Sequence, residues 1–276
     1  MRTLQQELSR LDGKGGVGAS LRKHLSAAGI TEWEDITKAA LFELRDHLAE
    51  AVAPGTAKTV VAHFKALLNR NEEELELPKG WRKVLAVKAT RPMKTYLNEN
   101  DLDKLERVVV HTNRQKFVKN VFLVCAYTGL RVSDAMNLTL ENIDGEVLRF
   151  AAQKTKKAGC IPLKSGLKER IGWVAAHPEY RVTLAGYNTA IRKMCKDAGI
   201  TEEVVVFKGG KELKGPKWQF ISSHSARIST ASCLNKRGVP LGDICALLQH
   251  SSPLQTNNYI VRDRVELSPK AMAFFN

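Results

Sequence analysis

The first third of the chain spaces its apolar residues as amphipathic helices do. Apolar side chains recur three or four positions apart through 17–29, 34–52 and 56–70, which gathers them on one face of a helix. The run Ala-Pro-Gly at 53–55 interrupts the pattern, because proline and glycine disfavour a helix interior. The pattern therefore predicts a small helical domain whose last helix begins near Thr56.

The helical spacing is lost between residues 76 and 97. This segment carries Pro78, Pro92 and several lysines and arginines without a sustained period, a composition typical of a connecting segment. We expect an extended basic linker here. The resulting division is a helical domain over 1–80, a linker over 81–97 and a second domain over 98–276.

Helical spacing returns after the linker and is joined by stretches typical of strands. A helix is expected over 98–112 with Asn100 as its N-cap, because an asparagine side chain can accept a hydrogen bond from the first turn. Two apolar runs within 146–163 flank the lysine-rich sequence Thr-Lys-Lys-Ala-Gly and predict a hairpin with that sequence at its tip. The other expected elements are helices over 115–129, 166–177, 186–199 and 225–250, the last interrupted at 238–240, and a strand pair within 204–222. The predicted fold class is mainly α with small β-hairpins, an α+β chain.

Net charge narrows the class of partner. The 276 residues hold 43 lysines and arginines against 29 aspartates and glutamates, a formal charge of +14. Such an excess favours a polyanion, most often nucleic acid, with an anionic membrane surface as the competing partner. No apolar run approaches the ~20 residues of a membrane span, and the first residues lack the apolar core of a signal peptide. We therefore expect a cytoplasmic protein without a membrane partner.

The sequence offers no pattern typical of a metal or nucleotide site. The five cysteines stand singly, without a Cys-x-x-Cys pair or a close histidine that would suit zinc, and we expect reduced, structural thiols. The stretch GKGGVGAS at 13–20 is close to a phosphate-binding loop. Ala19 stands where that loop needs a lysine, however, and a helix-like sequence precedes it instead of a strand. We expect no ATP site, no metal and no cofactor.

Four short segments of the second domain carry residue types that suit phosphoryl transfer. They are AYTGLRVSDAMNLT at 126–139, AQKTKKAGCIPL at 152–163, HSAR at 224–227 and LLQHSSPLQTNNYI at 247–260. In order and spacing they resemble the tyrosine recombinase family, the site-specific DNA integrases, resolvases and invertases. The resemblance covers roughly residues 97–265, and the helices over 17–75 look like the family's core-binding, SAM-like domain.

The resemblance implies a role for each residue of the set. Tyr259 would attack a DNA phosphodiester and form a phosphotyrosine, which conserves the bond energy so that rejoining needs no ATP. Arg131 and Arg227 would present planar guanidinium groups to the non-bridging phosphate oxygens. His224 and His250 would handle the tyrosine proton and bind the phosphate.

A general acid and a supporting carboxylate complete the set. Lys154 matches the family's general acid for the leaving 5′-oxygen. Lys156 and Lys157 lie on the same turn, and a shift of register would substitute one of them for Lys154. Asp134 follows Arg131 by three residues, so one helical turn would bring its carboxylate to the basic cluster and orient it.

Two positions depart from the usual sequence of the family. Ile228 follows Arg227 where many relatives have histidine, and Gln249 precedes His250 where a glycine is usual. Neither residue replaces a proposed catalytic group.

The resemblance also implies how the domains would act on DNA. They would form a C-shaped clamp around the duplex, with basic side chains on phosphates and a few side chains on base edges. Paired cuts on two duplexes would require a homotetramer assembled on a specific site in double-stranded DNA, with an accessory DNA-bending protein as a further partner. The apolar tail 268–276 is expected to dock on a neighbouring protomer. The candidates for DNA contact are Lys58, Thr59, His63, Arg192 and Lys193.

Several biological roles remain open within and outside this family. A chain of this length leaves little room for an additional arm-site domain, so we expect a compact integrase or inversion enzyme of a phage or mobile element. A Xer-like resolvase of chromosome or plasmid dimers is the alternative. A type IB topoisomerase would relax supercoils without a defined site, and a metal-dependent nuclease would need a carboxylate cluster. A non-catalytic DNA-binding relative would be expected to lose catalytic residues, and here all of them are present.

Overall fold

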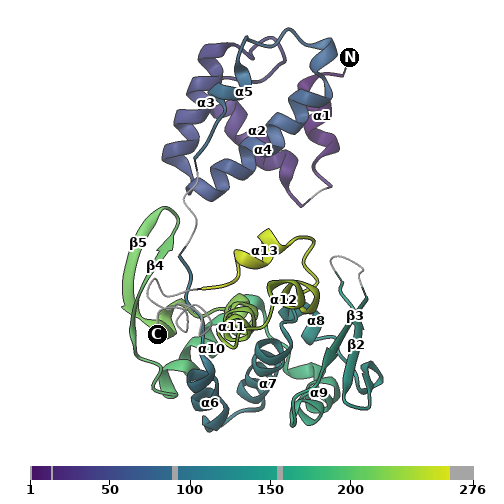
Figure 1. Cartoon of the computed structure of the whole chain (residues 1–276). Coiled ribbons are helices and arrows are strands. Elements are labelled where there is room, and N and C mark those ends of the chain that lie inside the picture. Colours follow the sequence, from purple (N-terminus) through teal and green to yellow (C-terminus); the bar gives the residue numbers. More distant parts are fainter. Residues whose placement is uncertain (1, 14, 89–92, 154–157, 262–276) are drawn as a thin grey trace, which may run out of the picture. The chain divides into compact units, whose positions relative to one another are not determined.

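A computed structural model divides the chain into two compact units, each with its own hydrophobic core (Figure 1). The structure describes residues 2–13, 15–88, 93–153 and 158–261. The helical unit comprises Met1–Pro92 with Phe207–Leu213, and the mixed unit comprises Met93–Val206 with Lys214–Asn276. How the units share DNA binding and catalysis stays a prediction.

The helical unit packs amphipathic helices around a leucine-rich core. Its helices are α1 (Leu4–Arg10), α2 (Val17–Ala27), α3 (Lys38–Ala51), α4 (Pro54–Arg70) and the short α5 (Trp81–Val84), with a 3-10 turn η1 (Glu72–Glu74) after α4. The α4 helix begins at Pro54 and not near Thr56, because a proline is well tolerated at the first helical position. Its residues Val60, Phe64 and Leu68 point into the core and are at most 5% exposed.

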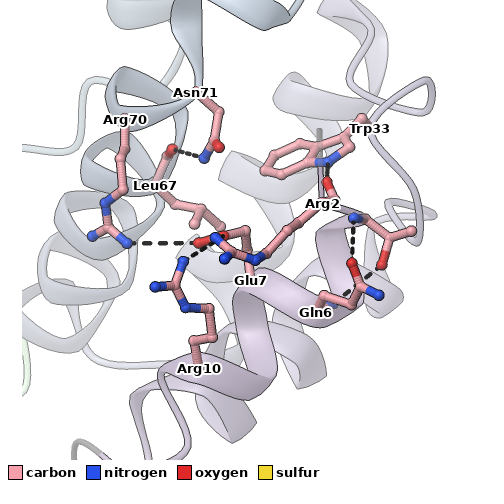
Figure 2. A network of polar contacts seen from close by, with 9 residues as sticks. Arg2, Gln6, Glu7, Arg10, Trp33, Leu67, Arg70 and Asn71 are labelled. Atoms are coloured by element: carbon pink, nitrogen blue, oxygen red, sulfur yellow. Dashed lines mark hydrogen bonds and ion pairs between the residues drawn. The ribbon is translucent and has the colours of Figure 1, made fainter.

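A buried carboxylate ties the first helix of this unit to α4. Glu7 lies within ion-pair distance of three arginines, at 2.9 Å from Arg10, 3.3 Å from Arg2 and 3.7 Å from Arg70 of α4, as Figure 2 shows. Burial opposes ionisation of Glu7, but the hydrogen bonds from Arg10 and Arg2 outweigh it and lower the pKa of the carboxyl. The glutamate therefore stays charged and holds the ends of both helices together.

The expectation of an extended linker is wrong for its first part. Trp81–Val84 forms the α5 helix, and Trp81, Val84 and Leu85 are buried in the core of the helical unit. Arg82 lies 4.5 Å from the centre of the Trp81 ring and pairs with Glu72. Apolar residues at 81, 84 and 85 give one turn an apolar face, and this local pattern outweighs the surrounding positive charge.

The mixed unit begins with an N-cap two residues earlier than the sequence suggested. Helix α6 (Glu99–Arg107) starts after Asn98, whose side chain accepts a hydrogen bond from the Asp101 N–H at 2.9 Å. The carboxylate of Asp101 accepts in return from the Asn98 N–H at 3.2 Å. This reciprocal capping favours Asn98 over Asn100, which lies inside the helix.

The other elements of this unit alternate helices with two small sheets. Its helices are α7 (Asn113–Thr128), α8 (Val132–Ala135), α9 (Leu167–Ala176), α10 (Leu184–Asp197), α11 (Ser223–Lys236), α12 (Leu241–Leu247) and α13 (Pro253–Asn257), with 3-10 turns at Leu140–Asn142, Pro178–Tyr180 and Lys217–Phe220. Its strands are β1 (Ile143–Asp144), β2 (Val147–Ala151) and β3 (Ala158–Pro162), together with parts of β4 (Glu203–Lys208) and β5 (Lys211–Pro216), whose joining segment 207–213 is grouped with the helical unit.

Two helices at the centre of the mixed unit are buried nearly all round. Helix α7 packs against α11 (Figure 1), and every residue of α11 from Ser225 to Ser232 is buried. Small side chains allow the two helices to approach closely. The buried Thr230 hydroxyl donates a hydrogen bond to the Ala126 carbonyl of α7 at 2.8 Å. This pair forms the rigid base on which the candidate site is built.

The hairpin expected within 146–163 is present. Strands β1, β2 and β3 form an antiparallel sheet, with Leu148 opposite Ile161 and Phe150 opposite Gly159. Strands β4 and β5 pair in a second sheet. The predicted α+β fold class is confirmed.

Candidate active site

Tyr259 lies among three other residues of the predicted catalytic set. The centre of its ring is 4.6 Å from that of His250 and 5.0 Å from that of His224, which meets it edge-on. The guanidinium carbon of Arg227 lies 5.6 Å from the centre of the same ring. Segments far apart in the sequence thus bring a phenol, two imidazoles and a guanidinium together.

Arg227 is held on the buried side of α11 by main-chain carbonyls. Its side chain donates to the carbonyl of Gly129 at 2.5 Å and to the carbonyl of Leu248, and the residue is 3% exposed. Burial and the nearby charge of Arg131 lower the pKa of Arg227 to about 10, against the opposing effect of Tyr259. The guanidinium is therefore still charged at neutral pH, and its orientation is fixed.

The glycine of the Thr-Gly-Leu-Arg motif is required by the packing around Arg227. Gly129 ends α7 in the left-handed conformation, with φ of 72°. A Cβ atom at this position would lie 2.5 Å from a methyl carbon of Leu248 and 3.2 Å from one of Leu247. Only a glycine allows α7 to end here and its carbonyl to meet Arg227.

Both histidines are shifted toward the neutral form. His250 is 7% exposed, and burial together with Arg227 and Arg131 lowers its pKa to about 4. Part of the His224 side chain reaches the surface, yet burial of the rest and the charges of Lys94, Arg227 and Arg131 lower its pKa to about 4 as well. Near pH 7 both imidazoles are therefore neutral.

A buried hydroxyl orients the His250 ring. The Nδ1 atom of His250 and the hydroxyl of Thr256 lie 2.9 Å apart, and Thr256 is fully buried on α13. When Nδ1 carries the hydrogen and donates it to Thr256, the other ring nitrogen Nε2 is left as the proton acceptor.

Gln249 adopts a backbone conformation that glycine adopts most easily. Its φ is 51°, in the left-handed region, which explains in physical terms why a glycine suits the position before His250. The Gln249 side chain lies above Gly159 of β3, where an added Cβ would meet its amide nitrogen at 2.0 Å. The departure from glycine thus comes with a contact between this turn and the hairpin.

Arg131 and Asp134 lie at the start and on the body of α8. Asp134 is buried, with its carboxylate 3.9 Å from the Arg131 guanidinium. Its other oxygen accepts a hydrogen bond from the Gln153 N–H at 3.0 Å, so the carboxylate joins the arginine to the end of β2. The residue after Gln153 is Lys154, which with Lys156 and Lys157 lies outside the described residues, and its predicted role stays a prediction.

Sequence reasoning missed one cation of this site. The ammonium of Lys94 lies 5.2 Å from the centre of the Tyr259 ring. Lys94 had been assigned to the basic linker, since its neighbours Met93 and Thr95 give no periodic or motif signal. Its charge was visible in the sequence, but its partner is 165 positions away.

Some of the residues predicted to contact DNA are exposed, and others already bond to protein groups. Lys58 and Thr59 are exposed on α4, opposite its buried apolar face, and His63 is half-buried. On α10, Arg192 donates to the carbonyl of Ile221 at 2.9 Å, and Lys193 forms an ion pair with Asp197 at 2.8 Å. None of these residues touches the candidate active site through a described contact, and their DNA contacts stay predictions.

Three polar atoms of the cluster are buried and make no hydrogen bond within the described part of the chain. They are Asp134 Oδ2, Arg227 Nε and His250 Nε2. Buried polar atoms are normally satisfied, and those that are not often mark the place of a ligand. Arg227 Nε is a donor that suits an anionic group next to the phenol, and His250 Nε2, as an acceptor, suits the phenol's proton.

Comparisons with known proteins identify the family of the chain. A model described as the phage integrase family matches residues 95–264, well over half of the chain. No curated protein sequence matches. The chain belongs to the phage integrase family, which confirms the resemblance drawn from its motifs.

Solved structures show the same fold at low sequence identity. The Tn1549 transposon integrase in complex with a circular intermediate DNA has a TM-score of 0.67 and 14% identity, with 100% of both chains covered. XerH recombinase bound to its palindromic difH substrate has a TM-score of 0.64 and 15% identity, and the match covers 88% of this chain and 71% of that one. A lambda integrase tetramer bound to a Holliday junction has a TM-score of 0.60 and 16% identity, and the match covers 96% of this chain and 81% of that one.

Proposed function

We propose that the chain is a tyrosine site-specific recombinase that cuts and rejoins DNA through a 3′-phosphotyrosine intermediate. The observation that carries the proposal is the placement of Tyr259 against His224, His250 and the fixed guanidinium of Arg227. Membership of the phage integrase family supports the same class of enzyme.

The geometry suits a single displacement at phosphorus. The Tyr259 oxygen would attack the phosphodiester and expel the 5′-oxygen of the next nucleotide, while the tyrosine proton passes to a neutral imidazole, with His250 Nε2 as the acceptor. Arg131 and Arg227 would neutralise the non-bridging oxygens, whose charge grows toward the transition state. Lys154 would give a proton to the leaving oxygen.

Rejoining reverses these steps on a new strand. A free 5′-hydroxyl attacks the phosphotyrosine, the phenol leaves, and the imidazole returns its proton. The number of phosphodiester bonds is unchanged, so neither a nucleotide nor a metal ion enters the proposed sequence.

The partner in this proposal is a specific recombination site in double-stranded DNA, bound by a homotetramer. The excess of 14 positive charges supports a DNA partner, and a lambda integrase that shares the fold is a tetramer on a Holliday junction. We place the reaction where a mobile element meets its target DNA, in the cytoplasm of its host cell. Among the described residues no helix has the length and apolar character needed to span a bilayer.

The biological role that we favour is integration and excision, or inversion, of a phage or mobile element. Resolution of chromosome or plasmid dimers remains the alternative, and XerH shares the fold to a similar degree. A purely DNA-binding role is disfavoured because His224, His250 and Arg227 lie around Tyr259, an arrangement that DNA binding alone does not need.

A nicked suicide substrate tests the chemistry directly. The duplex carries the end sequence of the element and a nick that lets the short 5′-hydroxyl product diffuse away, so that a covalent protein–DNA adduct accumulates. We expect an adduct on a denaturing gel with the wild type in EDTA and none with Tyr259→Phe, which keeps the ring but lacks the oxygen.

Two outcomes would contradict the proposal. An unchanged adduct with Tyr259→Phe would assign the nucleophile elsewhere. An adduct that forms only when magnesium is restored would replace the metal-free displacement with a metal-assisted one.

A further inference from the structure

Lys94 is a charged side chain of the candidate active site to which the reaction above gives no role. We propose that Lys94 is a positioning residue that holds the Tyr259 side chain for its attack on the phosphodiester. The inference rests on the proposed recombinase function.

Lys94 makes two contacts with the segment that carries the nucleophile. Its ammonium lies 5.2 Å from the centre of the Tyr259 ring, within the range of a cation–π interaction. It also donates to the main-chain carbonyl of Asn258 at 3.4 Å, one residue before the tyrosine. One contact restrains the ring and the other restrains the backbone, so together they fix the direction of the phenol.

The position of Lys94 is set by the helix that carries the other catalytic groups. Three residues beyond Lys94, the Leu97 N–H donates to the Ser229 hydroxyl of α11 at 2.9 Å. The thiol of Cys233, one turn further along α11, donates to the Leu97 carbonyl at 3.7 Å. Leu97 and Ser229 are fully buried. Lys94 is therefore anchored to the same helix as His224 and Arg227.

The charge of Lys94 is placed where it is costly in the absence of an anion. The titratable groups that interact with Lys94 are Tyr259 and His224, and Lys94 has no ion-pair partner in the part of the chain that the structure describes. Burial lowers the pKa of the ammonium. A partly buried cation that contacts the tyrosine without a carboxylate partner among the described residues suits a site in which negative charge develops during the reaction.

The location of Lys94 argues against a role as the general acid. In an in-line displacement the attacking and leaving oxygens lie on opposite sides of phosphorus. A side chain that touches the attacking tyrosine and the residue before it is thus on the wrong side to protonate the leaving 5′-oxygen. Lys94 acts through the tyrosine, and the role proposed for Lys154 is independent of it.

The test compares two variants of Lys94 with a matched control. Lys94→Met removes the charge and keeps a similar stem, whereas Lys94→Arg retains the charge. Lys88→Met removes the same charge from an exposed position in the same basic segment. Rates of adduct formation are measured on the suicide substrate in a single turnover, with the protein well above its dissociation constant for DNA.

We expect Lys94→Met to slow adduct formation by about 10- to 100-fold, the usual effect of a misplaced reacting group. Lys94→Arg should recover most of the rate, and Lys88→Met should react at close to the wild-type rate. Both methionine variants remove one cation, so they should weaken DNA binding by similar small factors and reduce its salt dependence alike. A reaction slower than that of Lys88→Met at a matched affinity is an effect that a merely structural role would not produce.

A substrate with sulfur in place of the bridging 5′-oxygen separates positioning from acid catalysis. A thiolate leaves without a proton, so the loss of a general acid is masked on this substrate, whereas the loss of a positioned nucleophile is not. We expect the Lys94→Met defect to persist with the sulfur substrate.

Two results would overturn the inference while the proposed function stands. Equal rates for Lys94→Met and Lys88→Met would show that Lys94 does not position the tyrosine, and recovery of Lys94→Met on the sulfur substrate would make it the general acid. If the wild type itself forms no adduct, the proposed function fails and the inference with it.

Discussion

Replacement of Gly129 by alanine should destabilise the mixed unit more than an ordinary left-handed glycine position would. At φ of 72° the alanine costs about 1 kcal/mol in backbone energy. Its Cβ would lie 2.5 Å from Leu248 and 3.2 Å from Leu247, and forcing a methyl group into a packed site costs about 1–3 kcal/mol more. Since the Gly129 carbonyl accepts a hydrogen bond from Arg227, we also expect slower adduct formation.

Gly238 supplies the matched control for this prediction. It follows α11 with φ of 78°, and an added Cβ there would meet nothing within 4 Å. Gly238→Ala should therefore show the backbone cost alone. Urea unfolding followed by circular dichroism gives both free energies, and we expect Gly129→Ala to be the less stable variant by about 1–3 kcal/mol. Equal losses would refute the packing argument and leave only the conformational one.

Two further predictions concern the turn around His250. Its folded pKa of about 4 lies below the ordinary 6.5, so between these values the unfolded imidazole holds a proton that the folded one does not. The free energy of unfolding should thus fall as the pH falls from 6.5 to 4, by on the order of 1–3 kcal/mol after allowance for solvent screening. Urea midpoints at pH 7 and 4.5 measure this fall, and an equally steep loss in His250→Gln would assign it to another group. Substitution of Gln249 by glycine relieves the strain of a side chain on a left-handed backbone but adds conformational freedom to the unfolded chain. The free energy of unfolding should therefore stay within about 1 kcal/mol of the wild-type value. Gln249→Val should be less stable than Gln249→Gly in the same assay, and the reverse order would contradict the argument from φ.

Local patterns allowed the larger elements to be predicted. The α7 helix carries an unbroken apolar run over 121–127, ends at a glycine and begins after Thr112, which caps it. The β2–β3 hairpin combines apolar runs with a polar tip. Such features depend on neighbours within one or two turns, and the sequence states them directly.

Contacts between distant segments could not be predicted in this way. The burial of Trp81 depends on a core formed by other helices. Lys94 meets Tyr259 only because Leu97 is tied to α11. The motif placed Arg227 in the site, but its carbonyl acceptors follow only from the packing of α7, α11 and α12.

The carbonyl acceptors of Arg227 make its orientation depend on distant parts of the chain. Gly129 and Leu248 lie 98 and 21 positions away from Arg227 in the sequence, at the ends of α7 and α12. A newly made or partly unfolded chain lacks one end or the other, and its arginine is then free to rotate. The orientation of this guanidinium is thus a property of the folded unit as a whole and not of the helix that carries it.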